Sequence, residues 1–401
     1  MKKVIVVGAG PAGLMAAIEA SKKHEVLVID KNAMCGRKLL ITGNGRCNVT
    51  NNRPTNDFLK HCSPSSKFLY SAFSQFDVNH LIEFFEMQHC PLVEEHDHRM
   101  YPMSQQSQSI LNVLLKACEK NKVNFLMETT VERLVIKNDK VVAVLCDKGH
   151  FECDHVILAT GGMSYPLTGS SGDGHAMLQM IGHSVTELYG VEVPLICHDE
   201  VIQTKKLQGL TLKDVKLEVI SNKKVIKQTH GDVLFTHFGL SGPSILYLSE
   251  WVQRELKKNH EVLISIRSTQ LNEQELLESM GPVVLAKWIK PFGPKRWTDY
   301  LLSETTLDKQ QLMNQLPKKD RLSLVNLLLK KTFMVHDTLS IDRAFVTAGG
   351  IKTSEIDPMT LKSKLVENVS ICGELLDCHG ELGGYNITIA MVSGHVSGKH
   401  V

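Results

Sequence analysis

The chain has 401 residues, of which 43% are hydrophobic and 22% are charged, and its formal net charge at pH 7 is +2. This composition is typical of a soluble globular protein with two or three domains. A net charge this small gives no large basic surface, so we expect no nucleic acid partner. No segment contains about 18 uninterrupted apolar residues, so we expect no membrane partner either.

The ten cysteines are scattered, with neither a C-x-x-C pair nor a metal-ligand spacing. We therefore expect reduced thiols and a cytoplasmic location. His96-Asp97-His98 brings two histidines close together, but this pattern is more typical of a polar loop, so no metal is predicted. The sequence leaves the oligomeric state, monomer or dimer, open.

The most informative segment lies at the start of the chain, where the apolar run Val4–Val7 leads into the glycine-rich residues 8–13. A helical apolar pattern follows, so strand, turn and helix occur in the order of the dinucleotide-binding fingerprint. Gly8 permits the tight turn, Gly10 admits a pyrophosphate, and Gly13 allows close helix packing. A second predicted strand ends in Asp30, whose carboxylate is expected to accept hydrogen bonds from a ribose. The pattern predicts a noncovalently bound adenine dinucleotide.

Strand-like and helix-like segments alternate up to about residue 190, which predicts a parallel sheet with helices on its faces. These segments are the strand 25–29, the helices 76–87 and 110–118, the hairpin 129–136 with 141–145, and the buried strand 154–162.

Beyond residue 193, shorter strand-like runs predict an antiparallel sheet or barrel. A helical pattern follows from about 272 to 331, and glycine-rich turns return after residue 341. The last strand and helix are therefore expected to close the first domain. The strand-like runs cover residues 215–221, 224–229, 232–236 and 261–267.

The C-terminal segment favours a flavin over a nicotinamide as the resident cofactor. An extended FAD needs turns that hold its isoalloxazine far from its adenine, and Gly383-Gly384 before a helix at Tyr385 supplies one. The positive end of this helix is expected to stabilise the anionic reduced flavin. Residues 36–51 form a predicted basic, glycine-rich loop, in which Arg37 and Lys38 are expected to neutralise the pyrophosphate and residues 42–48 to cradle the ribityl chain or the ring.

Together these motifs resemble the bacterial NAD(P)/FAD-dependent oxidoreductases known as aminoacetone-oxidase-like or BaiN-type flavoproteins. The resemblance covers nearly the whole chain. The segments that carry it are GAGPAGLMAA at 8–17, GRKLLITGNGRCNVTN at 36–51, ATGG at 159–162, TGSSGDGHAM at 168–177, THFGLSGPSIL at 236–246, VTAGGI at 346–351 and GELLDCHGELGGYNITIA at 373–390.

The resemblance implies an α/β fold class: a discontinuous Rossmann-like FAD-binding domain with an inserted β-barrel-like domain that carries a small helical subdomain. The implied bounds are 1–190 and 346–401 for the FAD-binding domain, 191–270 and 332–345 for the barrel, and 271–331 for the helical subdomain. FAD is expected to be noncovalently bound. The expected cofactor-binding residues are Gly8, Gly10, Pro11, Ala12, Gly13, Asp30, Lys31, Arg37, Lys38, Thr42, Gly43, Gly45, Arg46, Cys47, Asn48, Val131, Ala159, Thr160, Gly161, Gly373, Glu374, Asp377, Gly383, Gly384, Tyr385, Asn386 and Ile387.

Three residues have two interpretations each. Cys47 is either redox active or a small packed thiol. His237 is either a structural histidine or a proton donor and substrate contact facing the flavin. Tyr385 either packs its ring against the cofactor or donates its hydroxyl to the substrate. We therefore take His237 and Tyr385 as the candidate catalytic residues.

The sequence thus predicts an FAD-dependent NAD(P)H oxidoreductase, with NAD(P)H as a transient electron donor, that reduces a C=C or C=N bond of a small organic substrate. An FAD-dependent amine oxidase that uses oxygen would share every cofactor residue. Fumarate-reductase-like flavoproteins combine a similar ATGG turn and capping insertion, but an arginine and histidine set for a dicarboxylate is not evident here. An alternative of another class is a flavin-bound regulatory or RNA-related binding protein. The substrate and the preferred nicotinamide stay open.

Overall fold

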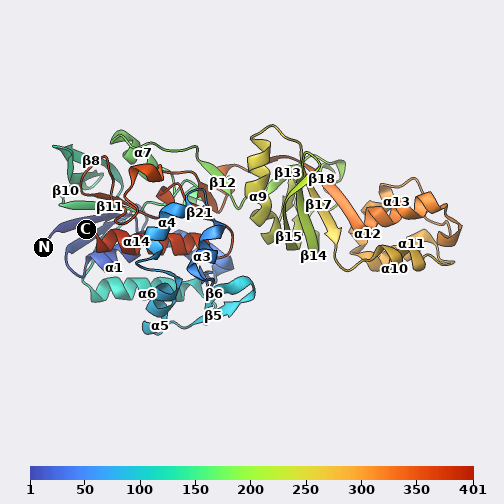
Figure 1. The fold of residues 1–401 in the computed structure, drawn as a ribbon, viewed down its shortest axis with the longest axis horizontal. Helices are drawn as coiled ribbons and strands as arrows, with labels where there is room; N and C mark the ends of the chain where they lie inside the picture. Colours follow the sequence, from blue (N-terminus) through green and yellow to red (C-terminus); the bar gives the residue numbers. More distant parts are fainter. The chain divides into compact units, whose positions relative to one another are not determined.

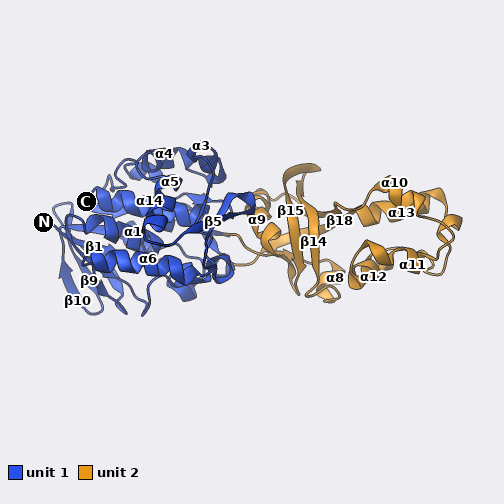
Figure 2. Ribbon diagram, turned by 90° about the horizontal axis from the view of Figure 1, so that it is seen from below, with its two compact units in different colours: residues 1–190, 341–401 blue, residues 191–340 orange.

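The computed structural model describes all 401 residues, which divide into two compact units. Unit 1 comprises residues 1–190 and 341–401, and unit 2 comprises residues 191–340 (Figure 2). The chain therefore leaves unit 1 once, forms unit 2, and returns to complete unit 1. Both termini lie in unit 1 (Figure 1).

Unit 1 is built on a five-stranded parallel sheet with strand order β20-β11-β1-β2-β7. The central strand β1 is buried at Val4, Ile5, Val6 and Val7, as expected for a parallel strand covered on both faces. The predicted parallel sheet is thus confirmed. Its strands are β1 (Lys3–Val7), β2 (Glu25–Ile29), β7 (Asn124–Leu126), β11 (His155–Leu158) and β20 (Val369–Ile371).

Two helices from opposite ends of the sequence pack against each other beside this sheet: α1 (Pro11–Ala20) and α14 (Tyr385–Lys399) (Figure 1). A Cβ on Gly394 would lie 2.1 Å from the carbonyl oxygen of Ala12, and one on Gly398 would lie 2.3 Å from that of Ala16. The backbones are therefore in contact, and the two helices run in the same direction. The helix α6 (Ser107–Lys120) also packs against α1.

Smaller elements surround this frame. The strands β8, β9 and β10 form one antiparallel sheet, in which β8 and β9 make the predicted hairpin, and β3, β6 and β5 form another. Their bounds and those of the remaining elements of unit 1 are α2 (Arg37–Ile41), β3 (Thr50–Asn51), α3 (Thr55–Phe58), β4 (Cys62–Ser63), α4 (Ser66–Phe73), α5 (Val78–Met87), β5 (Leu92–Glu95), β6 (Arg99–Pro102), β8 (Val131–Lys137), β9 (Lys140–Cys146), β10 (Gly149–Glu152), α7 (Asp173–Met180), β12 (Tyr189–Val191), β19 (Val346–Ala348) and β21 (His379–Gly380).

Unit 2 contains a closed barrel with strand order β13-β16-β15-β14-β17-β18. Four helices lie between β17 and β18 in sequence, and Trp297 of α12 contacts Phe235 and Phe333 of the barrel with ring centroids 5.7 and 6.5 Å away. The elements are β13 (Leu195–Cys197), α8 (Glu200–Gln203), β14 (Thr211–Ser221), β15 (Lys224–Phe235), β16 (Gly239–Ser241), α9 (Pro243–Leu256), β17 (Val262–Ser268), α10 (Glu273–Glu278), α11 (Leu285–Trp288), α12 (Lys295–Ser303), α13 (Lys318–Leu329) and β18 (Lys330–Thr338).

The Rossmann-type α/β fold and the barrel agree with the predicted fold class. Two details differ. The two strands predicted at 224–229 and 232–236 are one continuous strand, β15, which ends at Phe235, because Gly231 stays paired with Val215 of β14 instead of ending the strand. The predicted basic loop begins with a short helix, α2. The separate helical subdomain at 271–331 stays a prediction.

None of the helices combines the length and apolarity that crossing a bilayer requires. No group of three or more histidine, cysteine or acidic side chains is arranged to hold a metal ion. His96 and His98 instead lie 3.0 and 2.7 Å from the carboxylates of Asp97 and Glu94 on the surface of unit 1.

Candidate functional site

The turn between β1 and α1 is shaped by glycines that leave no space for side chains, with one exception. A Cβ on Gly8, whose φ is +107°, would lie 2.4 Å from the carbonyl oxygen of Ala159, and one on Gly13 would lie 1.8 Å from that of Gly8. A Cβ on Gly10 would meet no atom within 4 Å. The turn therefore has open space where a pyrophosphate is expected to approach the first turn of α1.

Asp30 follows β2 and is fixed beside this turn. The backbone N–H of Ala9 donates to its Oδ2 at 2.7 Å, and the backbone N–H of Asn32 donates to its Oδ1 at 2.8 Å. Oδ1 also accepts from Nδ2 of Asn32 at 2.9 Å, so Oδ2 is the oxygen with a lone pair left for a ribose hydroxyl. Arg37 donates to the Asn32 side chain at 2.8 Å, whereas Lys31 contacts Asp173 and Ser171.

The opposite wall of the Asp30 turn comes from the segment before β8. The N–H of Thr129 donates to the Asp30 carbonyl oxygen at 2.9 Å, and Val131, two residues further on, is buried. This places Val131 near the turn at which the adenine end of a dinucleotide is expected. Its contact with the cofactor stays a prediction.

The loop after α2 has an unusual backbone. Gly43, Asn44, Gly45 and Cys47 all have positive φ values between +55° and +82°. Arg46 anchors the loop, because its guanidinium donates to Glu95 at 3.0 Å and to Gln105 at 2.7 Å and lies 4.1 Å from the Tyr101 ring centroid. Arg46 therefore holds the loop in place, and the backbone groups of the loop stay accessible to a flat or polar ligand.

Within this loop Cys47 and Asn48 differ. Cys47 is fully buried, and burial raises the pKa of its thiol to about 12, so it stays protonated at neutral pH. This supports the packed thiol over the redox-active one. The Oδ1 atom of Asn48 is buried and has no hydrogen-bond partner. A buried unpaired acceptor is costly, so this atom is expected to bind a donor from a ligand.

A second turn built by glycines precedes α14. Gly383 and Gly384 have φ values of +138° and +95°, and a Cβ on Gly384 would lie 2.6 Å from the carbonyl of Thr50. Asn51 donates from Nδ2 to the carbonyl oxygen of Gly383 at 3.1 Å, while its buried Oδ1 has no partner. Helix α14 has neither a capping side chain nor an acidic residue in its first turn. Its positive end therefore faces this turn without compensation.

Tyr385 is the first residue of α14, and its ring lies in the core. It is only 3% exposed, with ring centroids of Phe58 and His61 at 4.7 and 5.1 Å. Burial raises the pKa of Tyr385 to about 12, and the neighbouring Arg53 guanidinium bonds to its hydroxyl. The environment favours a packing role over proton donation to a substrate. Asn386 bonds to both backbone groups of Gly380, and Ile387 packs against the core.

The relative placement of α1 and α14 fits an elongated ligand. Ala12 is level with Gly394, so α14 extends eight residues further toward its N-terminus than α1 does. At 1.5 Å per residue, this offset is about 12 Å along the helix axis. Two positive helix ends therefore point the same way at two separate positions, as a pyrophosphate and a distant ring system require.

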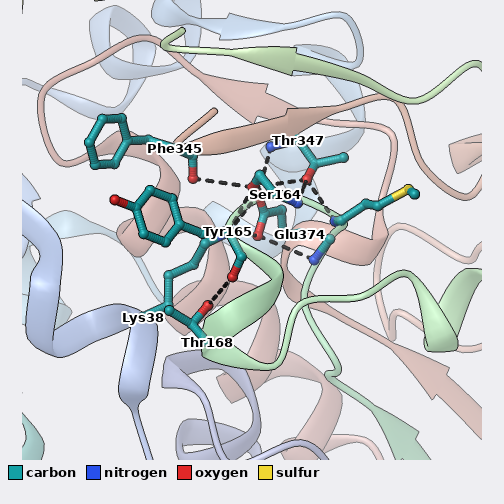
Figure 3. A network of polar contacts seen from close by, with 9 residues as sticks. Lys38, Ser164, Tyr165, Thr168, Phe345, Thr347 and Glu374 are labelled. Atoms are coloured by element: carbon teal, nitrogen blue, oxygen red, sulfur yellow. Dashed lines mark hydrogen bonds and ion pairs between the residues drawn. The ribbon is translucent and has the colours of Figure 1, made fainter. Parts of the chain in front are cut away.

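Near the start of α1 lies a polar network that joins four distant segments (Figure 3). The ammonium of Lys38 donates to the Ser164 hydroxyl at 2.8 Å and lies 3.1 Å from the Glu374 carboxylate. The same carboxylate accepts from the N–H of Thr347 at 2.7 Å and from that of Gly162 at 3.2 Å. Lys38 is thus engaged within the protein and not aimed solely at a pyrophosphate.

Burial raises the pKa of the Glu374 carboxyl, but Lys38 and the two backbone N–H groups outweigh it and hold the pKa below its ordinary value. Glu374 is therefore ionised at neutral pH. The adjacent Thr160 Oγ1 is buried without a partner. Thr347 belongs to a segment of the resemblance and Ser164 lies just after one, but nothing in a single sequence marks their hydroxyls as partners of Lys38 and Glu374.

Other predicted site residues are placed as follows. Gly373 has a φ of +72°, and its Cβ would lie 2.9 Å from that of Ala12, so it contacts the start of α1. Burial raises the pKa of Asp377, whose carboxylate is bonded by Thr186. His237 is exposed on the turn between β15 and β16 in unit 2, edge-on to Phe238 with ring centroids 4.9 Å apart. Its catalytic role stays a prediction.

The residues of unit 1 fit FAD on three structural grounds: the open space at Gly10, two uncapped helix N-termini, and unpaired buried polar atoms at the α14 end. Asp30 would hold the ribose, the first turn of α1 the pyrophosphate, and residues 42–51 with the start of α14 the isoalloxazine.

Comparison with known proteins shows the family of this chain. The family model described as HI0933-like protein Rossmann domain matches residues 2–400. The 3-dehydro-bile acid delta(4,6)-reductase of Clostridium scindens is 26% identical over 413 residues, covering 100% of this chain and 98% of the relative. The ribosomal RNA dihydrouridine synthase of Escherichia coli is 29% identical over 394 residues, covering 97% and 95%.

Among solved structures, the 3-ketosteroid delta1-dehydrogenase of Sterolibacterium denitrificans has a TM-score of 0.54 at 13% identity and covers 100% of this chain and 99% of its own. This likeness shows a shared fold. The family and the site together make the chain a flavoprotein oxidoreductase of the Rossmann type with FAD as its cofactor.

Proposed function

Because the chain belongs to the HI0933-like protein family, we propose that it is an FAD-dependent reductase that passes electrons from NAD(P)H to a C=C or C=N bond of a small organic substrate. The observation that carries the proposal is the α14 end of the site. There an uncapped helix N-terminus meets buried, unpaired oxygens of Asn48 and Asn51. The helix N-terminus favours a reduced flavin that bears negative charge and donates a hydride, and the two amide oxygens can accept hydrogen bonds from N–H groups of the ring.

The names of two full-length relatives support carbon–carbon double bonds as the acceptor. One is a delta(4,6)-reductase of a 3-dehydro bile acid, and the other is a dihydrouridine synthase. Both names describe hydrogen added across a ring double bond that is conjugated to a carbonyl group. We therefore favour an enone as the substrate of this chain, with the hydride delivered to the carbon distant from the carbonyl.

In this proposal the protein supplies position and electrostatics. Asp30 and the first turn of α1 bind the adenine ribose and the pyrophosphate, and FAD supplies the hydride chemistry when bound. His237 is proposed as a proton donor or substrate contact, since its imidazole is exposed on the turn between β15 and β16. The buried Tyr385 is assigned to packing.

Anaerobic reduction of the purified yellow protein tests the proposal. NADH or NADPH is expected to bleach the flavin, and a 3-oxo-4,6-diene steroid is expected to restore its colour with a stoichiometric loss of the diene absorbance. Bleaching by a primary amine, with return of colour only in air, would replace the reductase with an amine oxidase.

Uridine-containing RNA is run as a separate acceptor. Reoxidation by RNA alone would overturn the small-molecule substrate, while leaving reduction of a conjugated double bond in place.

A further inference from the structure

Arg99 lies next to the turn that opens α14. It is the first residue of β6, where it pairs in register with Asn51 of β3 and Glu95 of β5. A Cβ built on Gly383 would lie 3.7 Å from the Nε atom of Arg99. The guanidinium is therefore within one side chain's reach of the helix end at which the isoalloxazine is expected.

Its charge is less compensated than that of the other arginines around this turn. The Nε atom of Arg99 is buried without a partner, and the nearest carboxylate, that of Asp97, is 3.9 Å from its Nη2. By contrast, Arg46 has Glu95 at 3.0 Å and Gln105 at 2.7 Å. Arg53 has Asp57 at 3.2 Å and also bonds to the Tyr385 hydroxyl. Arg99 therefore has donors left for a ligand.

The turn itself is held by hydrogen bonds, so the guanidinium of Arg99 has a fixed position beside it. Asn51, which is 2% exposed, donates to the carbonyl oxygens of both Gly383 and Asp97. This amide links the turn that carries Arg99 to the turn that begins α14. A guanidinium and a helix N-terminus are thus held together, and both favour negative charge.

We propose that Arg99 and the first turn of α14 together hold the negative charge of the reduced flavin, so that reduced FAD stays anionic at neutral pH. The inference rests on the proposed function and names a residue that sets its driving force. Reduction by a hydride transfers two electrons and one proton to the flavin. When no second proton is bound, the negative charge remains on the ring, and Arg99 and the first turn of α14 would stabilise it.

Other charged groups near Arg99 oppose it weakly or are paired with one another. Asp97 opposes it weakly at 3.9 Å, and Glu95, across the β5–β6 pair, is neutralised by Arg46. On the α14 side, His61 lies 2.8 Å from Glu381. These pairs leave Arg99, with Asp97 at 3.9 Å, as the least compensated of the three arginines around this turn.

The midpoint potential of bound FAD, measured against pH, tests the proposal. Uptake of two electrons with one proton changes the potential by about 30 mV per pH unit, and uptake with two protons by about 60 mV, since tenfold in equilibrium is 29.6 mV for a two-electron couple. The native protein is expected to show the smaller slope at pH 7. Arg99→Gln is expected to lower the equilibrium constant for reduction of FAD about tenfold at pH 7. It should also extend the slope of about 60 mV per pH unit to higher pH.

Three further variants frame this result. Arg99→Lys, which keeps the charge, should restore most of the potential. Asp97→Asn, which removes the opposing carboxylate, should raise it. Lys140→Gln removes a cation on β9 that forms an exposed ion pair with Glu367. This variant should change neither the midpoint potential nor its pH slope. FAD content is checked by the absorbance of flavin released on heating.

An unchanged potential and pH slope in Arg99→Gln would overturn the inference. Should Arg99→Gln fail to bind FAD, a potential in Asp97→Asn that stays equal to the native value would overturn it equally. The proposed function fails on a different observation. If Arg99→Gln shifts the midpoint potential but no enone reoxidises the reduced native protein, Arg99 keeps its proposed role and the enone reductase activity is excluded.

Discussion

The two helix ends that define the cofactor site differ in what surrounds them. At α1 the space is shaped by backbone alone: Gly8 and Gly13 allow close approach, and Gly10 leaves a vacancy for a side chain. At α14 the turn is surrounded by polar side chains, among them Asn51 and Arg99, with atoms that lack partners. A site made of backbone can bind the phosphates of any dinucleotide, whereas a site made of polar side chains determines the redox chemistry of the attached ring. Binding and redox chemistry are therefore separable by mutation.

The largest effect is expected where the backbones of α1 and α14 are in contact. In Gly394→Val the new side chain collides with the Ala12 carbonyl, since even a Cβ would lie 2.1 Å from that oxygen. We expect a loss of about 3 kcal/mol in the free energy of unfolding, because overpacking here displaces backbone. Urea denaturation followed by circular dichroism measures it. Gly182→Ala is the control, because a Cβ there meets nothing within 4 Å; an equal loss in both would contradict the backbone contact.

The polar network near the start of α1 comes next. Lys38→Met leaves the Glu374 carboxylate without its cation. Breaking a buried pair costs about 3–5 kcal/mol. Because the side chains of Lys38 and Glu374 are 23% and 21% exposed, we expect about 2 kcal/mol here. The double variant Lys38→Met/Glu374→Gln should regain part of this loss.

The pH dependence of this variant has a definite sign. The lowered pKa of Glu374 means that its ionised form stabilises the native fold above the ordinary pKa of 4.5, and that this contribution is lost as the pH falls through the lower native value. The difference in unfolding free energy between native protein and Lys38→Met should therefore shrink below about pH 4.5. A difference that stays constant from pH 7 to pH 3 would show that the pair is not the cause.

At the α1 end, Gly10→Ala isolates binding from folding. Gly10 has an ordinary negative φ of −83°, and its Cβ would enter open space, so the apoprotein should unfold at the same urea concentration as native. FAD affinity should fall at least tenfold, about 1.4 kcal/mol, because the methyl group occupies the place of the pyrophosphate. Fluorescence titration of the apoprotein with FAD gives the comparison, and unchanged affinity would remove the pyrophosphate from this turn.

The smallest effect is expected at Cys47, near the α14 end. Its thiol is buried and its pKa is raised to about 12, so Cys47→Ala should cost about 1 kcal/mol of stability and leave the rates of flavin reduction and reoxidation within twofold. Stopped-flow absorbance measures both rates. A tenfold loss in either would return Cys47 to the redox role.

The contrast between the two ends also explains what the sequence can predict. The α1 turn is encoded in consecutive residues, because strand, glycines and helix follow one another and Asp30 lies one crossover away. Lys38 was expected at the pyrophosphate, but it contacts Glu374, which lies 336 residues away in the sequence. Arg99, Ser164 and Thr347 were missed for the same reason: an isolated polar residue has no local pattern that reveals which distant loop it meets.

Fold prediction followed the same division. The parallel sheet and the α14 helix follow from local apolar periodicity, and both were confirmed. The joining of residues 224–229 and 232–236 into one strand depends on β14, whose Val215 pairs with Gly231. Glycine ends a strand by local propensity, but a neighbouring strand supplies the pairing that sequence alone does not reveal.

The return of the chain to unit 1 has a consequence for biosynthesis. Helix α14 and strand β20 are translated after all of unit 2, yet α14 covers the backbone of α1 at Ala12 and Ala16. A nascent polypeptide emerging from the ribosome therefore carries an uncovered α1 surface until α14 is made, and domains generally fold as units during synthesis. Unit 2 can mature first, whereas cofactor loading must await the synthesis of α14.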